Sequence, residues 1–305
     1  MYTKSTLLLS FLLFGSAAQA QDRTEEIYAE PAFRSPVVAV EFTGQRCRYC
    51  PNLSRSLKES EQKYGKENYI ITALHSLTEF SSLPGNHVSL FHQEAQDYAA
   101  SIDVHPGLPQ LVYNTLGPTV SDHLLEEMFQ EDDLLECTGK VYYNAKQEYV
   151  IDIQTRLRRN QKEAIQGKKI DILFWALEND IVALQDDNGK FTYPAHQHIF
   201  RGSINGTWGE RYEIGTPYKK TLPIPERVSE VTNSEVVVFF LDHESRTILD
   251  AGRFAVSKLD PTGISSPTLM NDKNSTATYD LSGRKVEHPS KGGIYIHQGK
   301  KLMVK

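Results

Sequence analysis

Residues 37–51 read VVAVEFTGQRCRYCP and begin with an apolar run that has the composition of a buried strand. Residues 43–46 have the composition of a turn, and the residues from Cys47 to about Tyr64 have helical spacing. Pro51 is compatible with this helix, because a proline in the first turn removes no hydrogen bond. The stretch therefore predicts a strand, a turn and a helix, with two cysteines where the helix starts.

An alternation of strands and helices continues to about Gly139. Strand patterns lie at 69–75 and 110–113, and helical patterns lie at 88–102 and 121–137. Such an alternation predicts a sheet with helices on its faces. We therefore expect an α/β domain over residues 21–139.

The sequence becomes β-rich after this point. Short apolar segments separated by turns, among them Ile170–Leu177 and Glu235–Leu241, fill residues 140–260. This spacing predicts an all-β, immunoglobulin-like sandwich. A linker rich in Pro, Ser, Thr and Asn follows at 261–275, and strand patterns at 276–305 predict a short β-rich C-terminal tail.

The first 20 residues have the features of a signal peptide. Lys4 is followed by an apolar run and by Ala18-Gln19-Ala20, a pattern that signal peptidase cleaves. The apolar run is too short for a mature membrane anchor, the alternative interpretation. We expect an exported protein without a transmembrane helix. The net charge of −6 and the scattered basic residues argue against a nucleic-acid partner.

Cys47-Arg48-Tyr49-Cys50 is the strongest chemical signal in the chain. A helix N-terminus stabilises a thiolate, so Cys47 has a position suited to disulfide exchange, with Cys50 as the resolving thiol. A stable structural disulfide is the alternative. Zinc is a third interpretation, although it requires two more ligands and the chain has no second Cys pair.

Two segments resemble the thioredoxin superfamily. Phe42 to Pro51 is similar to its strand, Cys-x-x-Cys and helix, and Leu108-Pro109 before a strand looks like its cis-proline loop. The resemblance implies that Cys47 attacks, that Cys50 resolves and that Pro109 positions the substrate strand. Arg46 occupies the position of the family's usual Trp, and Arg48-Tyr49 is not the dipeptide of thioredoxins.

For the other polar residues that could bind a metal or react, the sequence favours structural roles. His196 and His198 would share one face of a strand, but no third metal ligand is evident, and His75 ends a strand near the cysteines. Residues 186–189, Asp-Asp-Asn-Gly, predict a hairpin turn rather than a calcium loop. Cys137 is interpreted as a buried thiol, with a regulatory partnership to the Cys pair as the alternative. We expect no cofactor and no metal.

The mature chain to about residue 260 also resembles the outer membrane protein 28 family of Bacteroidetes. Residues 40–51 look like its N-terminal signature, and residues 177–185 and 196–201, followed by Trp208-Gly209, look like its β-domain pattern. The resemblance implies an envelope-associated protein, sometimes described as an adhesin, and it assigns no catalytic residues.

The C-terminal tail is similar to sorting domains of type IX secretion. Its segments are 279–286, 293–296 and 299–305, and the alternative is a terminal hairpin that packs on the rest of the protein. The sequence therefore favours a peripheral outer-membrane or cell-surface protein that binds proteins or other surface ligands. A periplasmic location is the alternative. A thiol-disulfide oxidoreductase acting on exported proteins is the second functional hypothesis, and we favour the non-enzymatic one.

Overall fold

The computed structural model describes residues 35–81, 83, 87–102, 107–118, 125–130, 134–158, 161–259, 278–279, 286, 294–297 and 300–303. The predicted signal peptide at 1–20 and linker at 261–275 lie outside the described residues. Within the described part, no helix is long and apolar enough to cross a membrane.

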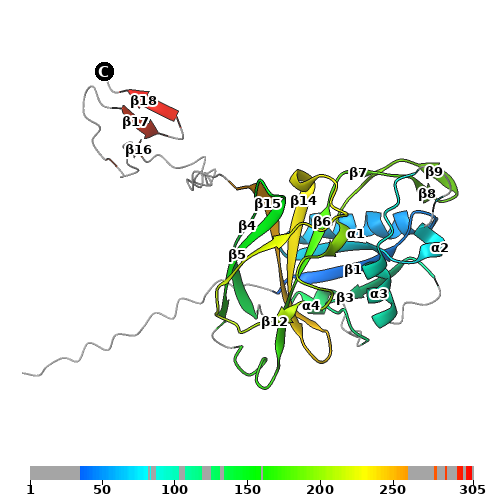
Figure 1. Ribbon diagram of the computed structural model, residues 1–305, viewed down its shortest axis with the longest axis horizontal. Helices are drawn as coiled ribbons and strands as arrows, with labels where there is room; N and C mark the ends of the chain where they lie inside the picture. Colours follow the sequence, from blue (N-terminus) through cyan, green and yellow to red (C-terminus); the bar gives the residue numbers. More distant parts are fainter. Residues whose placement is uncertain are drawn as a thin grey trace, which may run out of the picture.

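The N-terminal elements have the predicted strand, turn and helix arrangement. Strand β1 (Val37–Thr43) lies parallel to β2 (Tyr69–His75) and antiparallel to β3 (Gln110–Tyr113). Both β1 and β2 are buried along their whole length, which explains their continuous apolar character. Helices α1 (Cys50–Tyr64) and α3 (Gln93–Ser101) and the short α2 (Thr78–Ser81) complete this part (Figure 1).

Three helices differ from the sequence prediction. Helix α1 starts at Cys50 rather than Cys47, and α3 starts at Gln93, where the ring of His92 accepts a hydrogen bond from the N–H of Glu94 at 3.2 Å. The helix predicted at 121–137 is wrong at its C-terminal end. Only α4 (Leu125–Met128) is described there, and Cys137 lies in strand β4, where pairing with β5 outweighs the local helical pattern.

The β-rich region continues the sheet of the N-terminal part. The order of strands is β13-β5-β4-β15-β14-β6-β11-β2-β1-β3, and β12 also pairs with β6. The added strands are β4 (Leu135–Tyr143), β5 (Glu148–Leu157), β6 (Ile170–Glu178), β11 (Ile199–Ser203), β12 (Glu210–Arg211), β13 (Tyr218–Pro223), β14 (Ser234–Asp242) and β15 (Ile248–Lys258). The strands of the predicted sandwich are not separate from the N-terminal part, because they continue its sheet through β11 and β2. One mixed sheet runs through the described body, and the boundary predicted after residue 139 falls inside β4.

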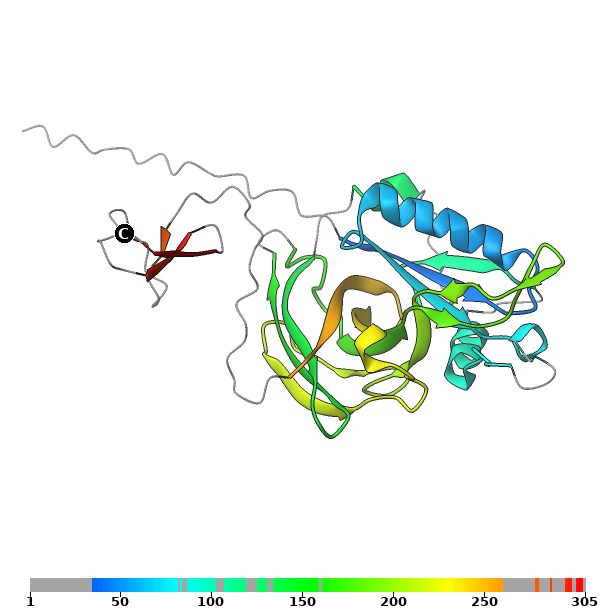
Figure 2. The ribbon, with the colours of Figure 1, turned by 90° about the horizontal axis from the view of Figure 1, so that it is seen from above.

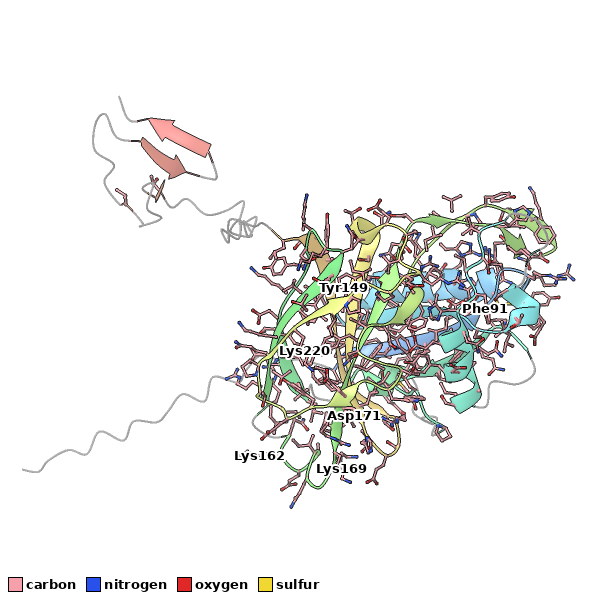
Figure 3. All side chains as sticks on the ribbon, in the orientation of Figure 1. Phe91, Tyr149, Lys162, Lys169, Asp171 and Lys220 are labelled. Carbon is pink, nitrogen blue, oxygen red and sulfur yellow. A yellow bond between two sulfur atoms is a disulfide. The ribbon has the colours of Figure 1, made fainter. Side chains whose placement is uncertain are left out.

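The sheet encloses a second core by curling back on itself, as Figure 2 shows from above. Tyr149 of β5, labelled in Figure 3, is fully buried and donates a hydrogen bond to Ser234 of β14 at 3.0 Å. Phe174 and Val238 point into this second core, whereas their neighbours Trp175 and Val237 point into the core beside α3. Strands β6 and β14 are thus buried on both faces, which accounts for their unbroken apolar runs.

The connection between β6 and β11 forms two small ribbons. One joins β7 (Ile181–Val182) to β10 (Ala195–His196), and the other joins β8 (Gln185–Asp187) to β9 (Lys190–Thr192). A 3-10 turn, η1 (Val231–Asn233), precedes β14. In the tail, β16 (Thr278–Tyr279), β17 (Ile294–His297) and β18 (Lys300–Met303) form an antiparallel sheet of their own.

A buried ionic cluster ties α1 to the β-rich region. Arg253 of β15 donates to Glu61 of α1 at 2.8 Å and to Glu235 of β14 at 2.6 Å. The Nδ1 atom of His198 lies 2.8 Å from the second oxygen of Glu235. Burial raises the pKa of Glu235, but the contact with His198 and the charge of Arg253 outweigh it and bring that pKa down to about 2.

Replacing Arg253 with Leu is expected to destabilise the fold by about 3 kcal/mol or more, because two buried carboxylates lose their cation. Lys219→Met is the matched control, since Lys219 pairs with Asp152 at 2.9 Å on the surface, where such pairs contribute about 0–1 kcal/mol. Urea unfolding followed by circular dichroism measures both effects. Equal effects of the two substitutions would contradict the role given to Arg253.

Candidate functional site

Cys47 and Cys50 form a disulfide at the N-terminus of α1. Their residues are 2% and 1% exposed, so the bond has almost no solvent-accessible surface. The disulfide leaves neither sulfur as a thiolate ligand, so the pair in this state does not bind zinc. Among the described residues, no group of three or more His, Cys, Asp or Glu side chains is arranged to hold a metal ion.

The β8–β9 hairpin lies against one side of the Cys-x-x-Cys loop. Its tight turn at Asn188 and Gly189, both with positive φ, is the one predicted from the Asp-Asp-Asn-Gly pattern. The N–H of Asp186 donates to the carbonyl of Gln45 at 2.8 Å, and the N–H of Asn188 donates to the carbonyl of Arg48 at 2.9 Å. The hairpin is therefore hydrogen-bonded through its backbone to the loop that carries the cysteines.

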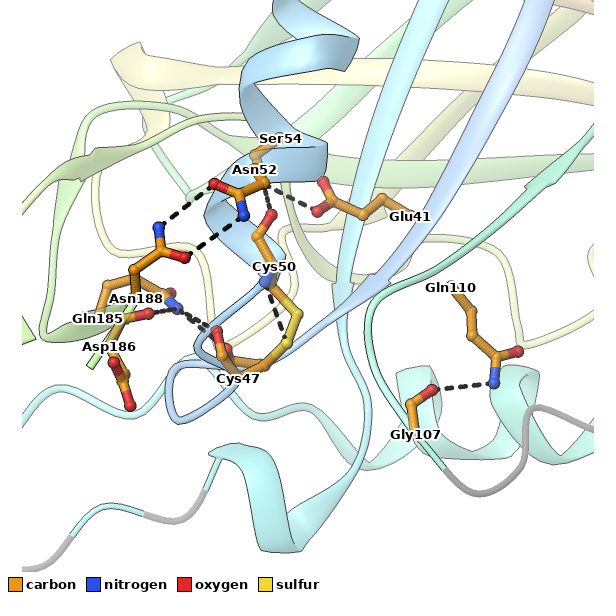
Figure 4. Close-up of a disulfide and its surroundings, with 11 residues drawn as sticks. Glu41, Cys47, Cys50, Asn52, Ser54, Gly107, Gln110, Gln185, Asp186 and Asn188 are labelled. Carbon is orange, nitrogen blue, oxygen red and sulfur yellow. Dashed lines mark hydrogen bonds between the residues drawn. A yellow bond between two sulfur atoms is a disulfide. The ribbon is translucent and has the colours of Figure 1, made fainter. Parts of the chain in front are cut away.

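Side chains strengthen this contact, as Figure 4 shows for Gln185. The Nε2 group of Gln185 donates to the carbonyls of Gly44 and Cys47, each at 3.2 Å. Arg55 of α1 forms an ion pair with Asp187 at 3.1 Å. Because Gln185 is 5% exposed, its amide replaces water as the partner of the loop carbonyls.

A second glutamine fixes the other side of the loop. Gln45 is fully buried, donates to the carbonyls of Val88 and Leu184 at 2.9 Å, and accepts a hydrogen bond from Leu90 at 2.8 Å. At Gly44 a Cβ atom would lie 2.7 Å from the Cβ of Phe80, so the chain approaches too closely for any other residue. Exchange requires a thiolate to reach a disulfide sulfur, and the exposures of 2% for Cys47 and 1% for Cys50 leave little surface for that approach.

The predicted cis-proline position is confirmed in its conformation. The Leu108–Pro109 bond is cis, and β3 begins directly after it at Gln110, whose amide donates to the carbonyl of Gly107 at 2.9 Å. Figure 4 shows this loop in the same close-up as the disulfide. The redox roles of Cys47, Cys50 and Pro109 stay predictions.

Glu41 belongs to strand β1, and its side chain lies between that strand and helix α1. Its carboxylate accepts a hydrogen bond from Ser54 of α1 at 2.8 Å and is 2% exposed. Burial raises the pKa of Glu41 to about 7, against hydrogen bonds from Ser54 and Thr43 that lower it. The site therefore contains a carboxyl group that exchanges a proton near neutral pH.

A cleft of about 890 Å³ lies beside Glu41, between α1, β2 and residues 194–199. The structure brings His75 and His196 together across it, with ring centroids 5.7 Å apart. Burial lowers the pKa of His75 and lowers that of His196 to about 4, so both rings are neutral at pH 7.

The predicted pairing of His196 with His198 on one strand is wrong. His196 ends β10, whereas His198 precedes β11 and has a φ of 55°, so the strand is broken between them. Each imidazole consequently has its own partner. His196 lies 3.3 Å from the carbonyl of Ala183, and His198 contacts Glu235.

Sequence reasoning missed Gln45, Gln185 and Glu41 as components of the site. A signal existed for Glu41, because an acidic residue within the buried run 37–42 is unusual without a partner or a raised pKa. For the two glutamines there was no local signal, since their acceptors come from distant segments.

Together these features define a protein with one large mixed sheet, a buried Cys-x-x-Cys disulfide at the start of α1, and a curled β region. Among solved structures, HBP35 of Porphyromonas gingivalis is similar in fold, with a TM-score of 0.59, 16% sequence identity, and coverage of 90% of this chain and 100% of that one. A domain of the outer membrane lipoprotein Omp28 from the same organism matches with a TM-score of 0.31 and 17% identity, covering 42% of this chain and 92% of that domain. No protein-family model and no curated protein matches the chain.

Replacing Gln185 with Ala is expected to accelerate reduction of the disulfide by dithiothreitol about thirtyfold, because loss of two hydrogen bonds of about 1 kcal/mol each favours hairpin opening. Gln197→Ala is the control, since Gln197 contacts Asp180 on the surface. Mass tagging of free thiols over time gives the rates. An unchanged rate in Gln185→Ala would show that the hairpin does not limit access.

Glu41→Gln is expected to remove the part of the pH dependence of folding stability that comes from the Glu41 carboxyl group. The folded pKa of about 7 lies above the ordinary glutamate pKa of 4.5, so the stabilisation from protonated Glu41 is fully present below pH 4.5 and is lost as pH rises through 7. The variant should gain up to about 3 kcal/mol relative to wild type between pH 4.5 and 8. Denaturant unfolding across this range measures the difference, and parallel pH profiles would contradict the raised pKa.

Proposed function

We propose that this chain is an exported binding protein of the outer membrane or cell surface, in which Cys47–Cys50 is a structural disulfide. The observation that carries the proposal is the burial of Cys47 and Cys50, 2% and 1% exposed, in a loop whose backbone the β8–β9 hairpin holds by hydrogen bonds. A bridge that cannot be reached stabilises the start of α1 and the hairpin contact rather than turning over.

The location of the protein rests on its sequence. Residues 1–20 resemble a signal peptide, and the segments at 279–286, 293–296 and 299–305 resemble a type IX sorting domain. The resemblance of residues 40–51 to the outer membrane protein 28 family adds an adhesin-type role to the proposal. The likeness to HBP35 of Porphyromonas gingivalis is a likeness of fold, and the family resemblance rests on the sequence segments.

A thiol-disulfide oxidoreductase is the second candidate, and one observation favours it. Glu41, with a pKa of about 7, is hydrogen-bonded to α1 through Ser54, one turn from Cys50, and is suited to exchange a proton with a thiol. In that mechanism the Cys47 thiolate attacks a substrate disulfide, the substrate's leaving sulfur takes a proton, and Cys50 then displaces the substrate from the mixed disulfide. The hairpin would have to open first.

Trapping separates the two candidates. Cys50→Ser, expressed in the natural host, should yield no mixed disulfide with envelope proteins, because Cys47 is 2% exposed. Cys47→Ser should retain binding to its surface ligands if the protein still folds, which circular dichroism checks. A ladder of dithiothreitol-sensitive adducts on Cys50→Ser would instead establish the oxidoreductase.

A further inference from the structure

Exposed apolar side chains gather at one end of the described body. Among the residues that the structure describes, six large apolar residues are exposed, and five of them belong to the Cys-x-x-Cys loop or to segments beside it. The five, here called the apolar tip, are Tyr49, Val88, Val182, Phe191 and Tyr193, with exposures of 54–60%. Large apolar groups gathered on a soluble surface indicate a contact site.

Contacts between the segments bring Val88, Val182 and Tyr193 near one another, and the Tyr49 loop meets the β8–β9 turn through Arg48. The hydroxyl of Tyr193 lies 3.3 Å from Nδ1 of His87, which places Tyr193 beside Val88. Val182 pairs with Ala195 across the β7–β10 ribbon, two residues from Tyr193. Phe191 is two residues before Tyr193 and so follows the same face of the chain. Figures 1 and 2 place β8 and β9 at the end of the molecule opposite the curled region.

Positive charge surrounds the apolar tip. Arg46, Arg48 and Lys190 are exposed, and no described carboxylate forms an ion pair with any of them. The guanidinium of Arg48 lies 5.9 Å from the ring centre of Tyr49 and touches the turn at Gly189. The hairpin's own carboxylates are engaged: Asp186 accepts from the N–H of Gly189, and Asp187 pairs with Arg55.

These charges are unusual in a chain whose net charge is −6. Arg46, Arg48 and Lys190 lie beside exposed aromatic and aliphatic side chains. Such a surface is complementary to a partner whose outer layer is anionic and whose deeper layer is apolar. A second copy docking through the same patch would bring like charges together. A protein partner would insert anchors into a pocket, but none of the five apolar residues lines the 890 Å³ cleft.

We propose that the apolar tip, with Arg46, Arg48 and Lys190, is a docking site for an anionic lipid surface. Phe191 and Val182 enter the boundary between headgroups and acyl chains, while the two tyrosines keep their hydroxyls at headgroup level. The three cations pair with lipid phosphates or other anionic headgroups. This inference rests on the proposed function, because it supplies the membrane contact of an exported protein, and it places the enclosed disulfide at the contact surface.

Flotation with lipid vesicles tests the site in the mature chain, residues 21–305. The protein should float with vesicles of equimolar phosphatidylcholine and phosphatidylglycerol, and much less with phosphatidylcholine alone. Two sets of substitutions, Phe191→Ser with Tyr193→Ser, and Arg46→Gln with Arg48→Gln and Lys190→Gln, should each lower partition into anionic vesicles at least about tenfold.

Matched substitutions elsewhere control for general losses of charge and apolar surface. Leu259→Ser removes the sixth exposed apolar group, and Lys140→Gln with Lys146→Gln and Lys162→Gln removes three exposed cations outside the tip. Neither should change partition, and circular dichroism should show that all variants are folded.

Absence of flotation with anionic vesicles, or equal partition of tip and control variants, overturns the lipid site. Loss of binding to a surface protein in the tip variants, without an effect on vesicles, assigns the tip to a protein partner and overturns it as well. Neither outcome bears on the disulfide, so a failure here is distinguishable from a failure of the proposed function, which trapping with Cys50→Ser reports.

Discussion

The pairing of β11 with β2 is the constraint from which the rest of the arrangement follows. The N–H of Ala73 donates to the carbonyl of His198 at 2.8 Å, and Ile199 lies beside Ala73 in parallel register. This contact joins the thioredoxin-like strands to β6, β14 and the curled region in one sheet. Because β6 and β14 then have a core on each face, neither part of the described body has a complete core without the other.

The pairing of β11 with β2 also determines which segment contacts the Cys-x-x-Cys loop. β11 begins near the C-terminal end of β2, the end at which β1 also leads into the Cys-x-x-Cys loop. The connection from β6 to β11 must therefore cross this end of the sheet, and it carries the β8–β9 hairpin onto the loop. A loop that has the sequence of a redox site thus carries a disulfide whose two cysteines are buried, and the hairpin is hydrogen-bonded to its backbone.

The parts that the sequence predicted have strong local signals. The apolar run at 37–42, the helix with Pro51 in its first turn, and the turn at 186–189 each follow from neighbouring residues. The continuation of the sheet and the hydrogen bonds of Gln45 and Gln185 depend on segments far apart in the chain, which no local pattern reveals. One signal of the shared sheet was available: the unbroken apolar runs of β6 and β14 are typical of strands buried on both faces, whereas a sandwich strand alternates.

The reduction potential of Cys47–Cys50 tests the central claim, that the bond is an enclosed structural bridge, most directly. It is measured in the purified mature protein by equilibration with glutathione and mass tagging of free thiols. The account predicts a value below about −300 mV, the range of structural disulfides, because opening the bridge also disrupts the contacts of the β8–β9 hairpin. A value near or above about −230 mV would place the pair among exchange-competent disulfides and contradict the account.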